Sequence, residues 1–200
     1  LKDGQKKLSP IQAYDIVMHT ADAVISGGVR RSATICVFSP DDTEMATAKT
    51  GTWFIDNPQR GRSNNSALLL RGETSKEQFA ELMKSVKEFG EPGFVWSDST
   101  ELLVNPCVEI GMWPVCEKTK ESGWQACNLS TINCSKIKTE QDFLDACRAA
   151  TIIGTLQAGF SKFEYLGGAS ERIISREALL GVSMTGIMEQ HEICLDPSAQ

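Results

Sequence analysis

The sequence predicts an α/β fold built mainly from parallel strands. Two observations support this prediction. Short apolar runs of strand length alternate along the chain with segments in which apolar residues recur at helical spacing. The run over residues 33–38 also shows little alternation between apolar and polar side chains, which is typical of strands buried in a parallel sheet. Such an arrangement fits either a barrel or an open sheet.

The first helix is expected to begin at Ser9-Pro10, because a hydroxyl N-cap followed by proline is a favourable helix start. Apolar residues recur at helical spacing from there to Ile25, and Gly27-Gly28 is expected to end the helix. The strand over residues 33–38 follows.

Residues 51–65 are the least regular part of the first half. They are rich in Gly, Pro, Asn, Ser and Arg, and we expect them to form a long ordered loop. Loops of this length are uncommon in compact domains unless they are functional. The flanking elements are expected to be a short helix over 44–49 capped by residues 39–42, a strand over 66–70, a helix opening at Thr74-Ser75, a turn at 90–93 and a strand over 94–96.

The second half is expected to continue this alternation. Residues 117–123 are polar and are expected to form a surface loop. Thr139 should cap a long helix that runs to about Tyr165. Residues 179–187 form another apolar strand candidate, which leads into a final short helix.

The composition is that of an ordinary globular protein, with 200 residues, 41% hydrophobic and 23% charged. The formal net charge of -6 argues against a nucleic-acid-binding surface. No apolar run reaches the ~20 residues of a membrane helix, and the polar start has no signal-peptide layout, so no membrane partner and a cytoplasmic location are expected. Leu1 is not a start methionine, which suggests a piece of a longer protein.

The seven cysteines are an odd number without any CxxC motif, and this pattern favours a reducing compartment. Their spacing does not match a common zinc site, so no metal site is expected. His19 and His191 have no companion ligands in the sequence and are assigned to structure. Cys36, Cys134, Cys147 and Cys194 are expected to be packing residues, whereas Cys116 is ambiguous.

The segment Asn105-Pro106-Cys107-Val108-Glu109 is the strongest candidate for chemistry. If it is extended, Asn105, Cys107 and Glu109 share one face. The thiol, the carboxylate and the amide would then project to the same side. The thiol could attack or carry a radical, the carboxylate could accept a proton, and the amide could orient a hydroxyl. Pro106 favours a loop tip over a central strand. By spacing alone, the pattern is short enough to arise by chance.

Six segments, in the same order, resemble the catalytic subunit of ribonucleotide reductase, and the resemblance covers nearly the whole chain. The first three of these segments are most similar to the adenosylcobalamin-dependent class II, whereas the iron-dependent class I shares the Asn-x-Cys-x-Glu core of the fourth. The segments are Gly27-Gly28-Val29-Arg30-Arg31-Ser32-Ala33, Ser63-Asn64-Asn65-Ser66, Gly90-Glu91-Pro92-Gly93, Asn105-Pro106-Cys107-Val108-Glu109, Cys127-Asn128-Leu129 and Gly181-Val182-Ser183-Met184-Thr185-Gly186-Ile187.

This resemblance implies that residues 1–200 are one partial domain, a central segment of a ten-stranded α/β barrel with a finger loop near 105–109. It also implies reduction of ribonucleotides to deoxyribonucleotides for DNA synthesis and repair. A thiyl radical at Cys107 would abstract the ribose 3′-hydrogen, Glu109 would act as general base, and Asn105 would hold the ribose hydroxyls. Cys127 would supply electrons by forming a disulfide with a cysteine upstream of this chain.

The resemblance further implies adenosylcobalamin as the cofactor. Expected partners are a ribonucleotide di- or triphosphate, a dNTP or ATP effector, a thioredoxin- or glutaredoxin-type reductant and the remaining parts of the reductase, without which the fragment is expected to be inactive. The 51–65 region matches the link between effector and substrate base, and its expected contacts are Gln59, Arg60, Arg62 and Asn64.

Two alternatives remain open at the level of sequence. The chain would be part of a class I large subunit if a diiron partner subunit delivered the radical. It would be a non-catalytic nucleotide-binding module if it kept the 51–65 loop but did not need Cys107. Arg30 and Arg31 are either nucleotide-proximal or ordinary salt-bridged charges.

Overall fold

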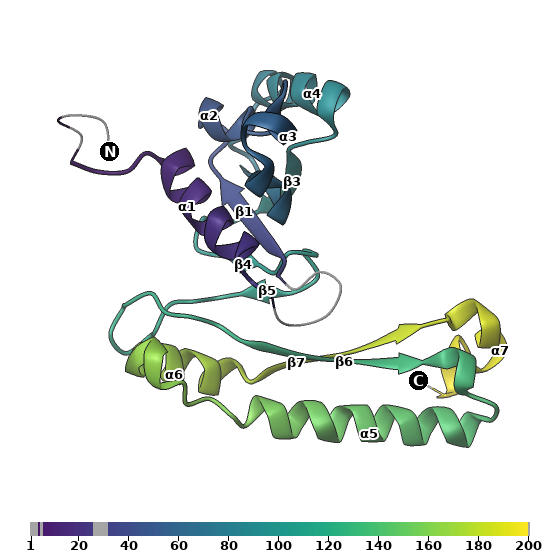
Figure 1. Ribbon diagram of the computed structural model, residues 1–200. Helices are drawn as coiled ribbons and strands as arrows, with labels where there is room; N and C mark the ends of the chain where they lie inside the picture. The colour runs from purple at the N-terminus through teal and green to yellow at the C-terminus, as the bar shows by residue number, and fades with distance from the viewer. Residues whose placement is uncertain (1–3, 5, 26–31, 200) are drawn as a thin grey trace. The chain divides into compact units, whose positions relative to one another are not determined.

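The computed structural model describes residue 4 and residues 6–25 and 32–199, and these divide into two compact units, Leu1–Met112 and Trp113–Gln200. Both units combine helices with parallel strands, which confirms the predicted α/β class (Figure 1). This division within the chain does not test the prediction that residues 1–200 are one part of a larger barrel. The first helix ends at Asp22, so the expectation that it runs to Ile25 and ends at Gly27-Gly28 is wrong. Gly27-Gly28 and the pair Arg30-Arg31 themselves lie outside the described residues.

The first unit contains a three-stranded parallel sheet in the order β1-β2-β3. Its strands are β1 (Thr34–Phe38), β2 (Ser63–Leu70) and β3 (Gly93–Ser97). Strands were expected at these three places. The central strand begins three residues earlier than predicted, because Ser63 already pairs with Thr34 of β1.

Helices of the first unit begin where their caps predict. Helix α1 (Pro10–Asp22) follows Ser9, whose N–H donates to Gln12 Oε1 at 3.0 Å. Helix α2 (Thr43–Ala46) starts at Asp42, and α4 (Lys76–Phe89) starts at Ser75, whose Oγ accepts from the Gln78 N–H. Gly90 ends α4 in the left-handed conformation that glycine adopts without strain.

The expectation of a long loop over residues 51–65 is wrong. The segment forms helix α3 (Trp53–Asp56) and the 3-10 helix η1 (Pro58–Arg62), and β2 then begins at Ser63. Proline suits the first position of a helical turn. Arg60 holds η1 against α1 through a paired contact with Asp15, which composition alone does not reveal.

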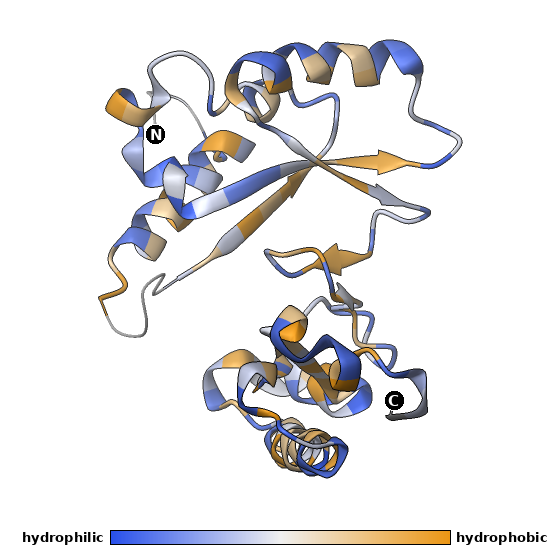
Figure 2. Cartoon of the chain, turned by 90° about the vertical axis from the view of Figure 1, so that its right-hand side faces the viewer, coloured by the Kyte–Doolittle hydropathy of each residue, from blue (hydrophilic) through white to orange (hydrophobic). Residues whose placement is uncertain are grey.

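The core of the first unit lies on one face of the sheet. Alternate residues of a strand point to opposite faces, and Ala67 and Leu69 of β2 are completely buried on the face that α1, α2 and α4 cover. Helix α4 carries both hydrophilic and hydrophobic residues, as a helix lying on a core should (Figure 2). The opposite face of β2, which presents Asn64, Ser66 and Leu68, borders the hollows described below.

The second unit pairs β6 (Cys127–Asn133) with β7 (Leu179–Thr185) in parallel. Helix α5 (Glu140–Ala158) follows the Thr139 cap but ends before the predicted Tyr165, at Gly159. Helix α6 (Gly167–Glu177) was not expected from the sequence, and α7 (His191–Cys194) is the predicted short final helix. Gly154 allows α5 to approach β7, because a Cβ there would lie 3.4 Å from Leu180 Cβ.

Candidate active site

A short hairpin closes the first unit and carries the Cys107 motif. Strands β4 (Leu103–Val104) and β5 (Gly111–Met112) pair in antiparallel fashion, and residues 105–110 connect them. The Val108 N–H donates to the Asn105 carbonyl at 2.9 Å, so the connection is a turn. The extended arrangement considered for this segment is therefore not formed, whereas the loop position that Pro106 favours is confirmed.

The loop brings together two of its three candidate catalytic side chains. Asn105 Nδ2 donates to Glu109 Oε1 at 2.7 Å, and Asn105 Oδ1 accepts from the Ile110 N–H at 3.1 Å. The amide thereby holds the carboxylate and closes the loop. Cys107 is exposed at the turn between them. The catalytic roles of these three residues stay predictions.

Two hollows flank the loop tip, and Cys107 lines both. One, of about 350 Å³, includes Thr34, Arg62 and Asn64, and the other, of about 440 Å³, includes Asn64, Ser66 and Glu91. Asn64 Nδ2 donates to the Pro106 carbonyl at 3.0 Å, and both of these residues also line the two hollows. The thiol is thus accessible beside polar groups at the amino-terminal ends of the strands.

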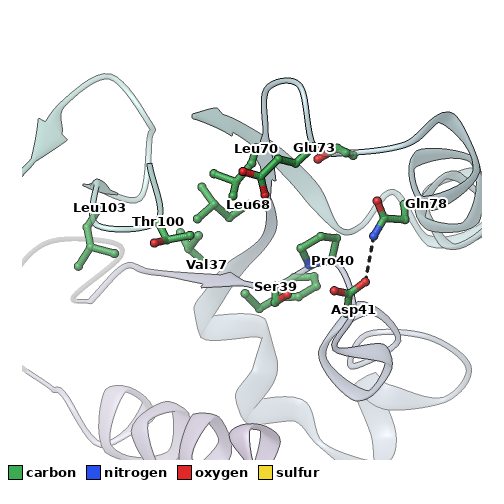
Figure 3. A pocket seen from close by; sticks show the side chains of 12 residues that line it. Val37, Ser39, Pro40, Asp41, Leu68, Leu70, Glu73, Gln78, Thr100 and Leu103 are labelled. Carbon is green, nitrogen blue, oxygen red and sulfur yellow. Dashed lines mark hydrogen bonds between the residues drawn. The ribbon is translucent and has the colours of Figure 1, made fainter. Parts of the chain in front are cut away.

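A third hollow, of about 460 Å³, lies at the carboxyl ends of β1 and β2 (Figure 3). Val37, Leu68 and Leu70 give it an apolar wall, and at its rim Gln78 Nε2 donates to Asp41 Oδ1 at 3.0 Å. Its lining contains neither cysteine nor histidine. It is therefore separate in position and in chemistry from the Cys107 loop.

The four residues predicted from the 51–65 region divide into two pairs. Gln59 and Arg60 both donate to Asp15, and Arg60 also donates to the Ala48 carbonyl at 2.7 Å. The Arg60 hydrogen bonds hold the pKa of Asp15 below its usual value. These two side chains anchor the segment to α1. Their predicted contact with an effector or substrate stays untested.

The other two predicted residues lie beside Cys107. Arg62 and Asn64 line one hollow together with the thiol, and Asn64 lines the second as well. Arg62 Nε also pairs with Asp22 Oδ1 at 2.7 Å, but both side chains are substantially exposed, so the pair contributes little. Of the four predicted residues, these two are therefore best placed to contact a ligand near the loop tip.

Lys49 is a buried cation that the sequence reasoning missed. It is 6% exposed, it bonds Glu91 Oε1 at 2.8 Å and the Ser63 carbonyl, and its Nζ lies 5.6 Å from the Trp53 ring centroid. Lysine is rarely buried, so no sequence signal pointed to it. It ties the turn before β3 to the start of β2.

Buried polar atoms without partners accompany this ion pair. Glu91 Oε2 and Asn65 Nδ2 have no hydrogen bond among the described residues, and each such atom costs about 1–3 kcal/mol. Asn65 Oδ1 does accept from Ser63 Oγ at 2.8 Å. Burial raises the pKa of the nearby Tyr14 hydroxyl, and hydrogen bonding by Ser63 and then by Asn65 offsets part of this rise.

Cys127 lies in the second unit, at the start of β6. It is half-buried and pairs in register with Leu179 of β7. The neighbouring Asn128 donates to the Leu179 carbonyl at 3.1 Å, which fixes this end of the strand pair. Its position is a regular strand rather than a loop. The predicted redox role of Cys127 stays a prediction.

Cys116 is the most unusual thiol of the second unit. It is 2% exposed, and the Arg172 Nε–H donates to its Sγ at 3.2 Å. Together with hydrogen bonds from Thr119, this contact lowers the Cys116 pKa from 9.0 to about 6. Cys134 and Cys194 are instead fully buried in the apolar core, as expected of packing residues.

Cys116 should make the stability of the protein depend on pH. Because its folded pKa lies below 9.0, its contribution is complete above the pKa of the unfolded thiol and is lost as the pH falls to about 6. The difference in Tm between wild type and Cys116→Ser should therefore shrink as the pH falls from 9.0 to about 6. Thermal unfolding monitored by circular dichroism measures it.

A Cys134→Ser variant controls for general loss of packing. Burial raises the pKa of Cys134 to about 11, so the difference in Tm that this variant causes should stay nearly constant over the same pH range. A constant difference for Cys116→Ser as well would contradict the thiolate at position 116.

No group of three or more histidine, cysteine, aspartate or glutamate side chains that could hold a metal occurs within the described residues. No helix in the described part of the chain is both long and apolar enough to cross a membrane.

Comparison with known proteins identifies similar sequences. A probable adenosylcobalamin-dependent ribonucleoside-triphosphate reductase of Dictyostelium discoideum is 26% identical over 92% of this chain and 24% of its own length. The reductases of that name from Lactobacillus leichmannii and Lacticaseibacillus paracasei are 25% and 28% identical, over 92% and 91% of this chain. The chain resembles part of an adenosylcobalamin-dependent ribonucleotide reductase.

This confirms the predicted resemblance, including the cobalamin-dependent class of the relatives. The chain spans about a quarter of the length of the curated relatives it matches. No family model and no solved structure matches the chain.

Proposed function

We propose that this chain is part of an adenosylcobalamin-dependent ribonucleotide reductase and carries its thiyl-bearing loop. The observation that supports the proposal best is the loop itself. Asn105 and Glu109 are hydrogen-bonded to each other at a turn whose tip presents an exposed Cys107. The names of the relatives favour this class over the diiron alternative, and they favour a triphosphate substrate over a diphosphate.

The proposed reaction replaces the ribose 2′-hydroxyl with hydrogen, releases water and oxidises two thiols to a disulfide. Cys107, as a thiyl radical, abstracts the 3′-hydrogen. Glu109 accepts the proton of the 3′-hydroxyl, and Asn105, which already holds this carboxylate, orients the ribose hydroxyls. Cys127 contributes one of the two oxidised thiols, and its partner belongs to the remaining reductase.

Adenosylcobalamin, when bound, supplies the radical that Cys107 receives. The residues present fit this role, because Cys107 is exposed and two hollows, of about 350 and 440 Å³, open beside it. Cys107 is the residue of this chain to which the cofactor-derived radical would be transferred. The groups that bind the corrin are assigned to the remaining parts of the reductase.

The proposal includes the family architecture, in which a ten-stranded α/β barrel surrounds the finger loop. The short hairpin that follows the parallel sheet of the first unit in the sequence is consistent with such a loop. It also includes a dNTP or ATP effector near the segment that contains Arg62 and Asn64, a thioredoxin- or glutaredoxin-type reductant, and a role in making DNA precursors in the cytoplasm.

The proposal is tested with the full-length reductase that contains this chain. Purified protein given ribonucleoside triphosphate, a dithiol and adenosylcobalamin should form deoxynucleotide, which chromatography detects. Omission of adenosylcobalamin should stop the reaction. Turnover without cobalamin that instead requires a diiron protein would show that the class I alternative is correct. Absence of turnover with either radical source would contradict reductase function.

A further inference from the structure

The Cys107 loop has little stabilisation of its own. Its flanking strands, β4 and β5, have only two residues each, and so short a pair is weakly stable in isolation. Val108, the residue after Cys107, has a φ of 65°, which is unfavourable for a β-branched side chain. A conformation of this kind persists only when the surrounding structure holds it.

Among the described residues, one hydrogen bond connects this loop to the sheet. Asn64 Nδ2 donates to the carbonyl of Pro106, the residue before Cys107, at 3.0 Å. The other hydrogen bonds described for the loop, which join Asn105 to Val108, Glu109 and Ile110, run within the hairpin itself. The Asn64 contact therefore sets where the tip lies relative to β2.

Asn64 is itself on a firmly held strand. It lies in β2, the central strand of the sheet, and pairs in register with Ile35 of β1. The preceding residue, Ser63, accepts a hydrogen bond from the buried Lys49. The sheet therefore holds Asn64 in position, and the hydrogen bond from Asn64 in turn stabilises the position of the loop.

The contact also lies between the two hollows that flank the thiol. Asn64, Pro106 and Cys107 each line both hollows, so the amide and the carbonyl form part of the wall between them. Loss of the hydrogen bond would free the Pro106 carbonyl. The thiol next to it would then no longer keep a defined position between the two hollows.

We propose that Asn64 is a positioning residue that holds Cys107 in place through the Pro106 carbonyl. Its importance for turnover rests on the reductase function proposed above, but its effect on the loop does not. The residue was also expected to contact an effector or substrate, and that contact stays a prediction beside this positioning role.

The Asn64→Asp variant of the full-length protein tests this proposal. Aspartate has nearly the same shape but places an oxygen against the Pro106 carbonyl, where asparagine places an N–H. Hydrogen exchange at the amides of residues 107–109 should become about 3- to 10-fold faster, as expected for loss of one hydrogen bond. The value of kcat should fall about 10- to 100-fold with KM nearly unchanged, because misplacement of a reacting group slows chemistry.

Two further variants make the test specific. Asn57→Asp introduces the same charge on the same segment, at a residue whose described hydrogen bonds go to Trp53 and Arg60 rather than to the hairpin, and it should leave both measurements unchanged. Asn64→Ala removes the donor without adding charge, and it should reproduce the faster exchange if the aspartate variant folds poorly.

Unchanged exchange in both Asn64 variants would overturn the proposal. A rise in KM without faster exchange would also overturn it, because Asn64 would then contact a ligand instead. If the wild-type protein lacks reductase activity but the variants show faster exchange, the proposed function fails while the structural role of Asn64 stands.

Discussion

Replacement of Cys107 with serine is expected to abolish ribonucleotide reduction by the full-length protein. Serine is nearly the same size but its hydroxyl cannot take over one-electron chemistry from the thiol, so no hydrogen abstraction should occur. The loss should be on the order of 10⁶-fold, the lower end of enzymatic rate accelerations. Deoxynucleotide formation at saturating substrate measures it.

Stability should barely change in this variant, since Cys107 is exposed and makes no core contact. Cys147→Ser is a matched control, because this half-buried thiol on α5 has no proposed role in the reaction. Its turnover should equal that of wild type. Residual turnover by Cys107→Ser above about 1% would show that another group carries the radical, and it would favour the non-catalytic interpretation of this segment.

The Glu109→Gln variant is expected to lower kcat about 10²- to 10⁴-fold, which is the usual contribution of a general base. Glutamine can still accept the hydrogen bond from Asn105 Nδ2 through its amide oxygen, so the loop should keep its shape. Only the capacity to accept a proton is lost. Steady-state kinetics should therefore show a reduced kcat with a nearly unchanged KM.

Glu101→Gln provides the control for charge. This carboxylate is exposed, lies a few residues before the hairpin and is absent from the linings of the hollows beside Cys107. Its kinetic constants should match those of wild type. A Glu109→Gln enzyme with kcat within about threefold of wild type would assign the base to another residue.

Local signals in the sequence predicted most element starts correctly. Ser9-Pro10, Asp42, Ser75 and Thr139 begin helices because their side chains or their neighbours satisfy the free N–H groups of the first turn. The loop at Cys107 was equally predictable, because proline is disfavoured in a central strand. These effects act over a few residues and can therefore be read without knowledge of the fold.

Elements that depend on distant partners were predicted poorly. Residues 51–65 look like a loop by composition. Arg60 of this segment, however, forms paired hydrogen bonds with Asp15, 45 positions earlier, and this contact stabilises η1 next to the start of β2. The burial of Lys49 likewise depends on Glu91 and Ser63. Helix α6 has a glycine-rich start that gives no local signal, and Arg176 holds it by donating to the carbonyls of Trp113 and Val115.

The sequence by itself determined the α/β class, the helix caps and the motif that resembles a ribonucleotide reductase, because each depends on residues close together in the chain. Only the tertiary structure decided that Asn105 binds Glu109 across a turn rather than along a strand. It also decided that Asn64 reaches the Pro106 carbonyl, and that Gln59 and Arg60 are engaged by Asp15. The Asn64 and Asp15 contacts join residues more than forty positions apart, and the Asn105–Glu109 contact depends on the turn between them, so residue spacing alone does not predict any of the three.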